Sequence, residues 1–147
     1  MGRRRAAREA ALQALYLLGV SSYPSSENAA LLSVRRGTNP QGDKDDAAFC
    51  EALVSGARAK MGDVDAAIES AAQNWSLERM ALVDKTILRL AAYELLFSPQ
   101  TPPKAVIDEA IEITRKFSSE ESTKFVNGVL DKIARGAKSH DSPESSL

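Results

Sequence analysis

The stretch 76–97 constrains the fold most, because it describes a helix that needs neighbours on almost every side. From Ile87 onward its faces are apolar nearly all round, and such a helix is usually wrapped by other elements. Ser76 is a candidate N-cap, and the prolines that begin at Pro99 prevent the helix from continuing. We therefore expect 76–97 to be the core helix. One stripe at helical spacing predicts its buried face: Met80, Val83, Ile87, Leu90 and Ala91.

The rest of the chain is also predicted to be helical. Aromatic residues make up only 5% of the sequence, and Ala, Leu, Glu, Lys and Arg dominate, a mixture that favours helices. No stretch shows the alternation of a strand, so we expect an all-α fold of about seven helices. Besides the core helix, apolar spacing and turn residues predict helices at 3–19, 27–34, 43–61, 63–74, 101–117 and 118–136.

The starts of four helices are predicted from their capping residues. Asp43, Asp63 and Thr101 are expected N-caps, since their side-chain oxygens can accept a hydrogen bond from the first turn. Ser118 and Glu121 have the spacing of a capping box, in which two side chains satisfy backbone N–H groups reciprocally.

Length and composition indicate one domain of 1–136 with a short tail. A chain of 147 residues falls within the usual size of a single domain. The segment 35–42 has the composition of a linker, and after Gly136 the polar tail 137–147 is expected to be disordered. Gly128 lies inside the last helix at a cost of about 1 kcal/mol relative to alanine, which predicts a close crossing with another helix.

Side chains for catalysis or metal binding are scarce in the sequence. The only histidine, His140, falls in the expected tail, and the only cysteine, Cys50, lies near the apolar stripe of a helix, where a buried thiol is expected. We therefore expect no enzyme, no metal site and no cofactor. No window approaches the roughly 18 apolar residues of a membrane span, and no signal peptide is recognised, so we expect a cytoplasmic protein.

Basic charge is concentrated at the N-terminus. Four of the 19 basic residues lie in the first eight positions, and the rest of the chain carries 15 basic against 20 acidic residues. Cations at a helix N-terminus oppose the helix dipole, so the cluster suggests compensation by an external anion. Arginine suits phosphate, which favours a nucleic acid, although an acidic protein, a membrane surface or a solvated helix end also fits. The cluster consists of Arg3, Arg4, Arg5 and Arg8.

Four stretches together resemble the NusB family of bacterial transcription antitermination proteins. They are 3–16, 87–95, 106–112 and 124–132, in the order and spacing of the family. The last of them, Lys-Phe-Val-Asn-Gly-Val-Leu-Asp-Lys, is the most specific. The resemblance covers the chain from about Arg3 to Ile133.

The resemblance implies an all-helical fold of two small subdomains, here about 1–75 and 76–136, and a non-catalytic RNA-binding factor. Proteins of this family bind the single-stranded boxA element of ribosomal RNA leader transcripts. They do so together with NusE, a small-subunit ribosomal protein, and the pair joins the antitermination complex on RNA polymerase.

The resemblance also suggests which residues contact these partners. On the first helix, the expected RNA-binding residues are Arg3, Arg4, Arg5, Arg8, Gln13 and Tyr16. Asp84, Lys104 and Glu121 match family positions near the joint surface for RNA and NusE. Pro103 stands where many members have a larger side chain. Some members dimerise through surfaces that include the first helix, and the sequence leaves a homodimer open.

Two other functions remain open at this point. One is a helical protein-interaction module whose arginines meet an acidic protein. The other is a stand-alone relative of the NusB-like RNA-binding domain of ribosomal RNA cytosine methyltransferases. Competition between RNA and the protein partner would separate the first from an antitermination factor.

Overall fold

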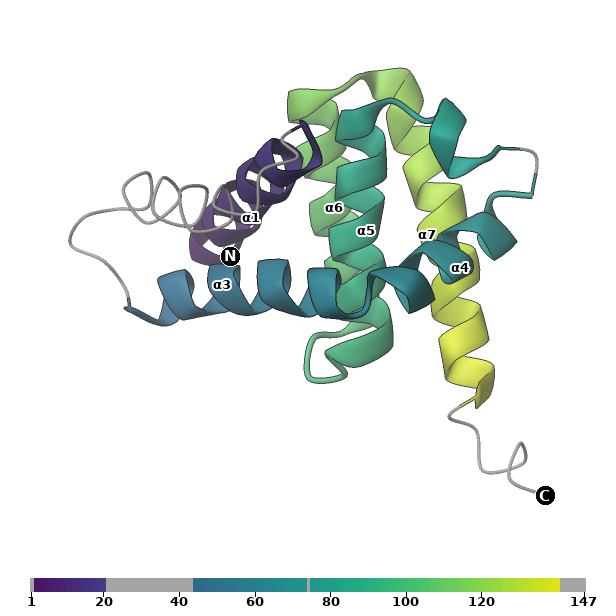
Figure 1. Cartoon of the computed structure of the whole chain (residues 1–147). Coiled ribbons are helices and arrows are strands. Elements are labelled where there is room, and N and C mark those ends of the chain that lie inside the picture. Colours follow the sequence, from purple (N-terminus) through teal and green to yellow (C-terminus); the bar gives the residue numbers. More distant parts are fainter. Residues whose placement is uncertain (1, 21–43, 74, 141–147) are drawn as a thin grey trace. The chain divides into compact units, whose positions relative to one another are not determined.

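The structure, a computed structural model, describes residues 2–20, 44–73 and 75–140, and all regular secondary structure in these ranges is helical. This confirms the expected all-α class. The elements are α1 (Gly2–Val20), α3 (Lys44–Ala59), α4 (Met61–Ala71), the 3-10 helix η1 (Leu77–Arg79), α5 (Leu82–Phe97), α6 (Pro103–Phe117) and α7 (Glu120–His140), shown in Figure 1. The expected helix 27–34, the linker 35–42, the cap Asp43 and the tail beyond His140 lie outside the described residues.

Contacts divide the chain into two units, Met1–Ala59 and Lys60–Leu147. The family resemblance implied subdomains of about 1–75 and 76–136. By contacts the chain divides at Lys60, because α4 packs with α5 and α7. In the first unit α1 packs against α3. The buried face of α1 is largely the one predicted: Ala11, Leu12 and Leu15 are buried and Leu18 is half-buried.

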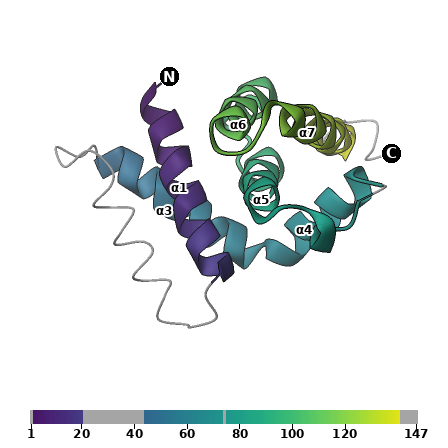
Figure 2. The same ribbon diagram turned by 90° about the horizontal axis from the view of Figure 1, so that it is seen from above.

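In the second unit α5 is the central helix. It packs against α4, α6 and α7, and Figure 2, which looks nearly along α5, shows α6 and α7 beside it and α4 on its other side. The predicted apolar stripe is buried at Met80, Ile87, Leu90 and Ala91 and half-buried at Val83. An ion pair also joins α5 to α4. Arg89 Nε and Nη2 donate to the two carboxylate oxygens of Asp65 at 2.8 and 3.0 Å. This paired geometry is the strong form of an ion pair.

The expectation of one continuous core helix over 76–97 was wrong at its N-terminal end. The stretch contains η1 and then α5, which begins only at Leu82. Ser76 has an extended backbone (φ −84°, ψ 154°) and makes no capping hydrogen bond from its side chain. Met80 is extended as well, with ψ 143°. This short turn lets the chain leave α4 and enter α5 while Leu77 and Met80 both stay buried, at 9% exposed.

Two further helix starts differ from the predicted caps. α4 begins at Met61, so Asp63 lies in its first turn, where its charge still favours the helix dipole. α6 begins at Pro103 with Pro102 before it, one residue later than the start predicted from Thr101. A proline at the first helical position loses no hydrogen bond, since that N–H has no partner within the helix.

The start of α7 is capped one residue later than predicted. Ser119, rather than Ser118, precedes the helix, and its hydroxyl oxygen accepts the backbone N–H of Ser122 at 3.0 Å. The core face of α7 is the predicted one, with Val126, Val129, Leu130 and Ile133 buried and Phe125 half-buried. The helix also continues past Gly136 to His140, so the expected end at Gly136 was wrong.

The predicted close crossing at Gly128 is also wrong. Gly128 is exposed, and a Cβ added there would meet no atom within 4 Å. Its backbone does not have a positive φ either, so glycine is not required by the conformation. The residue is therefore a weak point of α7 rather than a contact.

We expect Gly128→Ala to stabilise the protein by about 1 kcal/mol, because alanine has the higher helix propensity and nothing obstructs its methyl group. The free energy of unfolding from urea titration measures the effect. Gly136→Ala is the matched control: it is equally open but lies nearer the helix end, where a smaller gain is expected. A loss of stability in Gly128→Ala would show that another chain element approaches this position.

Candidate nucleic-acid interface

The predicted basic cluster forms the first two turns of α1. Arg3, Arg4, Arg5 and Arg8 all lie in the helix, and its first turn contains no acidic residue. Arg4 is exposed, and Arg5 and Arg8 are half-buried. The start of a helix carries partial positive charge, so basic residues add to the potential there rather than cancel it. The result is a local attraction for anions.

Two of these arginines converge on one aromatic ring of α3. The guanidinium carbon of Arg4 lies 4.2 Å from the ring centre of Phe49, and that of Arg8 lies 5.2 Å from it. The spacing of four residues puts Arg4 and Arg8 on the same face of α1, one turn apart, and α3 packs against α1. Both distances are within the range of a cation–π interaction.

The other predicted residues of α1 do not share this face. Gln13 is nine residues from Arg4, about two and a half helical turns, so the two side chains leave opposite sides of the helix. Tyr16 is eleven residues, about three turns, from Arg5, so those two lie along a common face. Gln13 is exposed and Tyr16 half-buried. The predicted set therefore splits into separate faces of α1.

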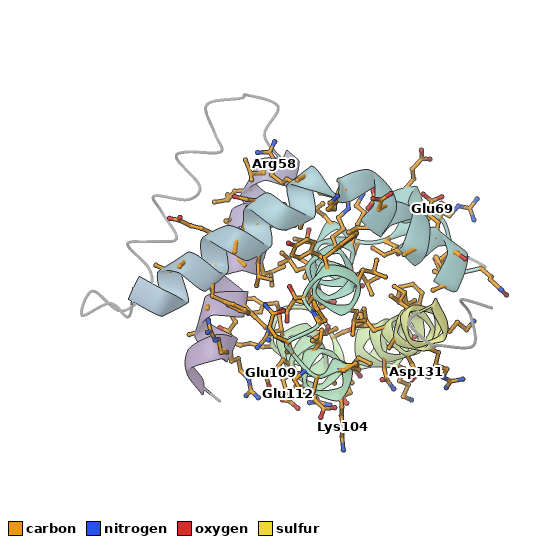
Figure 3. The ribbon with its side chains drawn as sticks, turned by 90° about the horizontal axis from the view of Figure 1, so that it is seen from below. Arg58, Glu69, Lys104, Glu109, Glu112 and Asp131 are labelled. Carbon is orange, nitrogen blue, oxygen red and sulfur yellow. The ribbon has the colours of Figure 1, made fainter. Side chains whose placement is uncertain are left out.

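The second unit has a hollow of about 500 Å³ at the starts of α5 and α7. Two of the three residues predicted for the joint surface, Asp84 and Glu121, line it together. The third, Lys104, does not: it is exposed on α6 and its side chain projects away from the helices in Figure 3. The full lining consists of Trp75, Arg79, Met80, Ala81, Asp84, Glu121, Ser122, Lys124 and Phe125.

Asp84 connects the two helix starts and keeps one oxygen unused. Its Oδ2 accepts a hydrogen bond from the Ser122 hydroxyl at 3.0 Å, which joins the first turns of α5 and α7. Its Oδ1 is buried and has no hydrogen-bond partner among the described residues. A buried polar atom without a partner is costly, so this oxygen is a ready acceptor for an incoming donor.

An aromatic pair forms part of the same hollow and was not among the predicted site residues. Trp75 is 52% exposed, and its ring meets that of Phe125 edge-on, with centroids 6.3 Å apart and planes at 66°. Arg79 and Lys124, both exposed, add positive charge to the rim. The available signal was the combination of the only tryptophan with nearby cations. Helical periodicity does not reveal this pair, because it places Trp75 in a connection between helices and Phe125 on a core face.

The described residues contain no candidate metal site, and the only cysteine and the only histidine of the sequence both lie in helices. No three potential metal ligands cluster within residues 2–20, 44–73 and 75–140. Cys50 is fully buried, as expected, and desolvation, with a smaller contribution from Glu51, raises its pKa to about 12. His140 belongs to the last turn of α7 rather than to a tail. None of the described helices combines the length and the apolarity needed to cross a membrane.

Comparison with known families matches residues 5–135 to the NusB family. The chain belongs to the NusB family. A curated relative, the transcription antitermination protein NusB of Elusimicrobium minutum, is 46% identical over 142 residues, which are 94% of this chain and 97% of that protein.

Solved structures of NusB proteins have the same fold. NusB from T. maritima superposes with a TM-score of 0.77 at 34% identity, covering 90% of each chain. A structure of the antitermination factors NusB and NusE in complex with double-stranded RNA gives a TM-score of 0.81 at 27% identity, covering 92% of this chain and 98% of that one. The likeness therefore extends over nearly the whole chain.

We expect Cys50 to resist thiol reagents in the folded protein, because a thiol with a pKa of about 12 is almost entirely protonated near neutral pH. Labelling with a chromogenic disulfide reagent at pH 8 should be slow without urea and complete with it. The folded pKa lies above the unfolded value of about 8.5, so ionisation favours unfolding and stability should fall as the pH rises above that value. Cys50→Ala is the control, because it removes the contribution of thiol ionisation to the pH dependence of stability. Rapid labelling of the folded chain would mean that the structure around Cys50 opens readily.

Proposed function

We propose that this protein is a transcription antitermination factor that binds RNA and has no catalytic activity of its own. Its membership of the NusB family and its similarity to curated antitermination proteins over nearly their whole length support this. The proposed RNA is a single-stranded boxA-type element, as the family resemblance implies. Action on nascent transcripts at RNA polymerase would place the protein in the cytoplasm.

The observation that carries the proposed RNA contact is the start of α1. Arg4 and Arg8 gather over Phe49 in a helix whose first turn contains no acid. Guanidinium groups suit phosphate because their planar N–H donors match its oxygens in pairs. A flexible single strand can follow such a cluster, with its phosphates held and its bases free to stack.

The hollow at the starts of α5 and α7 is proposed as the second contact surface, shared by RNA and NusE. The exposed ring of Trp75 suits stacking of an unpaired base, and the unused Asp84 Oδ1 suits an amino group of a base or a donor from NusE. Glu121, on the same rim, suits a basic side chain of the protein partner. Lys104 lies apart from the hollow and is proposed for a contact farther along NusE or RNA.

This division of roles supports binding by a pair of proteins rather than by this chain alone. Both charge signs line the hollow, with Arg79 and Lys124 near Asp84 and Glu121, so it is less suited to RNA than the start of α1. NusE would extend the RNA-binding surface, and the complex would then join RNA polymerase. A homodimer that covered α1 would compete with RNA, so the proposed binding form leaves this helix accessible.

We expect the double variant Arg4→Ala, Arg8→Ala to bind RNA more weakly and with a smaller salt dependence. Each phosphate that is no longer neutralised should lower the slope of log affinity against log salt by about 0.7, and two phosphates should lower it by about 1.4. The measurement is fluorescence anisotropy of a labelled boxA-type RNA, with and without NusE, over a salt series. Tighter and sequence-selective binding with NusE supports the antitermination role.

The control is the double variant Lys132→Ala, Arg135→Ala, which removes the same charge from an exposed part of α7. It should leave both affinity and slope nearly unchanged if the start of α1 is the binding site. Equal losses of affinity in the two double variants would mean that only net charge matters. Absence of RNA binding by the unsubstituted chain, with and without NusE, would contradict the proposed function.

A further inference from the structure

The contact between α1 and α3 brings an aromatic ring under the two arginines that we assign to RNA. Phe49 is half-buried on α3, and the guanidinium carbons of Arg4 and Arg8 lie 4.2 and 5.2 Å from its ring centre. Figure 1 shows α1 beside α3, from which this ring comes. One side chain of α3 thus contacts two members of the basic cluster.

Such a ring restricts the rotamers of the two side chains that contact it. The face of an aromatic ring carries negative charge and attracts a guanidinium group. A free arginine side chain has many rotamers, and an anion that binds it must hold it in one of them at an entropic cost. A guanidinium already held on a ring has given up much of this freedom before the anion arrives, so the cost of binding is smaller.

The ring also offsets a repulsion in the free protein. At 4.2 and 5.2 Å from one ring centre, the guanidinium groups of Arg4 and Arg8 are close enough to repel each other, since screening at 0.1 M salt acts over about 10 Å. Arg4 also lies in the first turn of the helix, where a cation is unfavourable. Attraction to Phe49 therefore keeps together two charges that would tend to separate.

The contact with the ring does not itself use the groups that bind an anion. A cation–π contact is made by the charge of the guanidinium group and forms no hydrogen bond through its N–H donors. Those donors are the ones that pair with phosphate oxygens. The ring can hold an arginine in place without competing for the anion.

We propose that Phe49 is a positioning residue that pre-orders Arg4 and Arg8 for the phosphates of an RNA strand. The inference rests on the proposed function and adds to it a residue outside the basic cluster. Phe49 itself need not touch RNA. Its effect on affinity passes through the two arginines.

If Phe49 served only to pack the helices together, a different property of its side chain would matter. The residue belongs to the apolar stripe of α3 that also contains Leu53, Val54 and Ala57, all of which are buried. Packing requires apolar volume at this position, which leucine supplies in part. Positioning requires the face of an aromatic ring, which tyrosine supplies and leucine does not.

The experiment compares Phe49→Leu with Phe49→Tyr by anisotropy of the boxA-type RNA in the presence of NusE. Phe49→Leu should weaken binding about fivefold, in keeping with the removal of two cation–π interactions near the surface, and Phe49→Tyr should restore it to within about twofold. The salt slope should be unchanged in both, because the arginines and their phosphate partners remain. Circular dichroism establishes that each variant is folded at the temperature used, and Phe49→Met replaces the leucine variant if that one unfolds.

A double-mutant cycle separates positioning from packing. In the Arg4→Ala, Arg8→Ala background, measured at low salt so that binding is detectable, Phe49→Leu should cause no further loss of affinity. A loss of affinity of the same size in both backgrounds would overturn the inference, since the ring would then act independently of the arginines. Wild-type affinity in Phe49→Leu, or failure of Phe49→Tyr to restore binding, would overturn it as well.

A measurement without RNA tests the same contact directly. The ring current of Phe49 should shift the side-chain Nε–H NMR signals of Arg4 and Arg8, and both shifts should disappear in Phe49→Leu and persist in Phe49→Tyr. Signals already typical of free arginine in the unsubstituted chain would overturn the inference alone. Absence of RNA binding by the unsubstituted chain would instead overturn the proposed function, so the two failures are distinguishable.

Discussion

The burial of α5 on several sides is the constraint on which the second unit depends. α4, α6 and α7 each need a partner for their apolar faces, and α5 supplies it to all three. Leu88 and Ala92 of α5 are fully buried. The hydroxyl of Thr86, which is also buried, donates to the Leu82 carbonyl oxygen at 2.6 Å, and this hydrogen bond offsets the cost of burying a polar group. Because α5 fixes its neighbours, the hydrogen bond between Asp84 and Ser122 can hold the starts of α5 and α7 together and shape the hollow between them.

The first unit depends in the same way on the packing of α1 against α3. The small residues Ala7, Ala11 and Ala14 are fully buried on α1, while Arg4, Arg5 and Arg8 stay at least partly accessible. The same packing brings Phe49 to Arg4 and Arg8. The fold thus prepares a cationic cluster in one unit and a hollow with an exposed aromatic ring in the other, two surfaces that suit different parts of a ribonucleoprotein partner.

The features that could be predicted from sequence are those set by helical periodicity and local charge. The buried faces of α1 and α7 follow from helical spacing, the class from composition and spacing, and the basic start of α1 from the distribution of charge. The break at Met80, next to η1 where it contacts α4, could not be predicted, and neither could the open position of Gly128 or the contact between Phe49 and α1. Each depends on which helices meet, which one sequence does not reveal. Asp84 and Glu121 were expected at a joint surface only from the family resemblance, and Trp75 and Arg79, which line the same hollow, were not expected there.

The central claim is that RNA lies along the start of α1, and cross-linking tests it most directly. A boxA-type RNA carrying a photoreactive uridine at successive single positions would be irradiated with this protein and NusE, and the cross-linked peptides identified by mass spectrometry. The account predicts cross-links to peptides from residues 3–16, at several neighbouring positions of the RNA. Cross-links confined to the C-terminal half of α7, with none on α1 or α3, would contradict it.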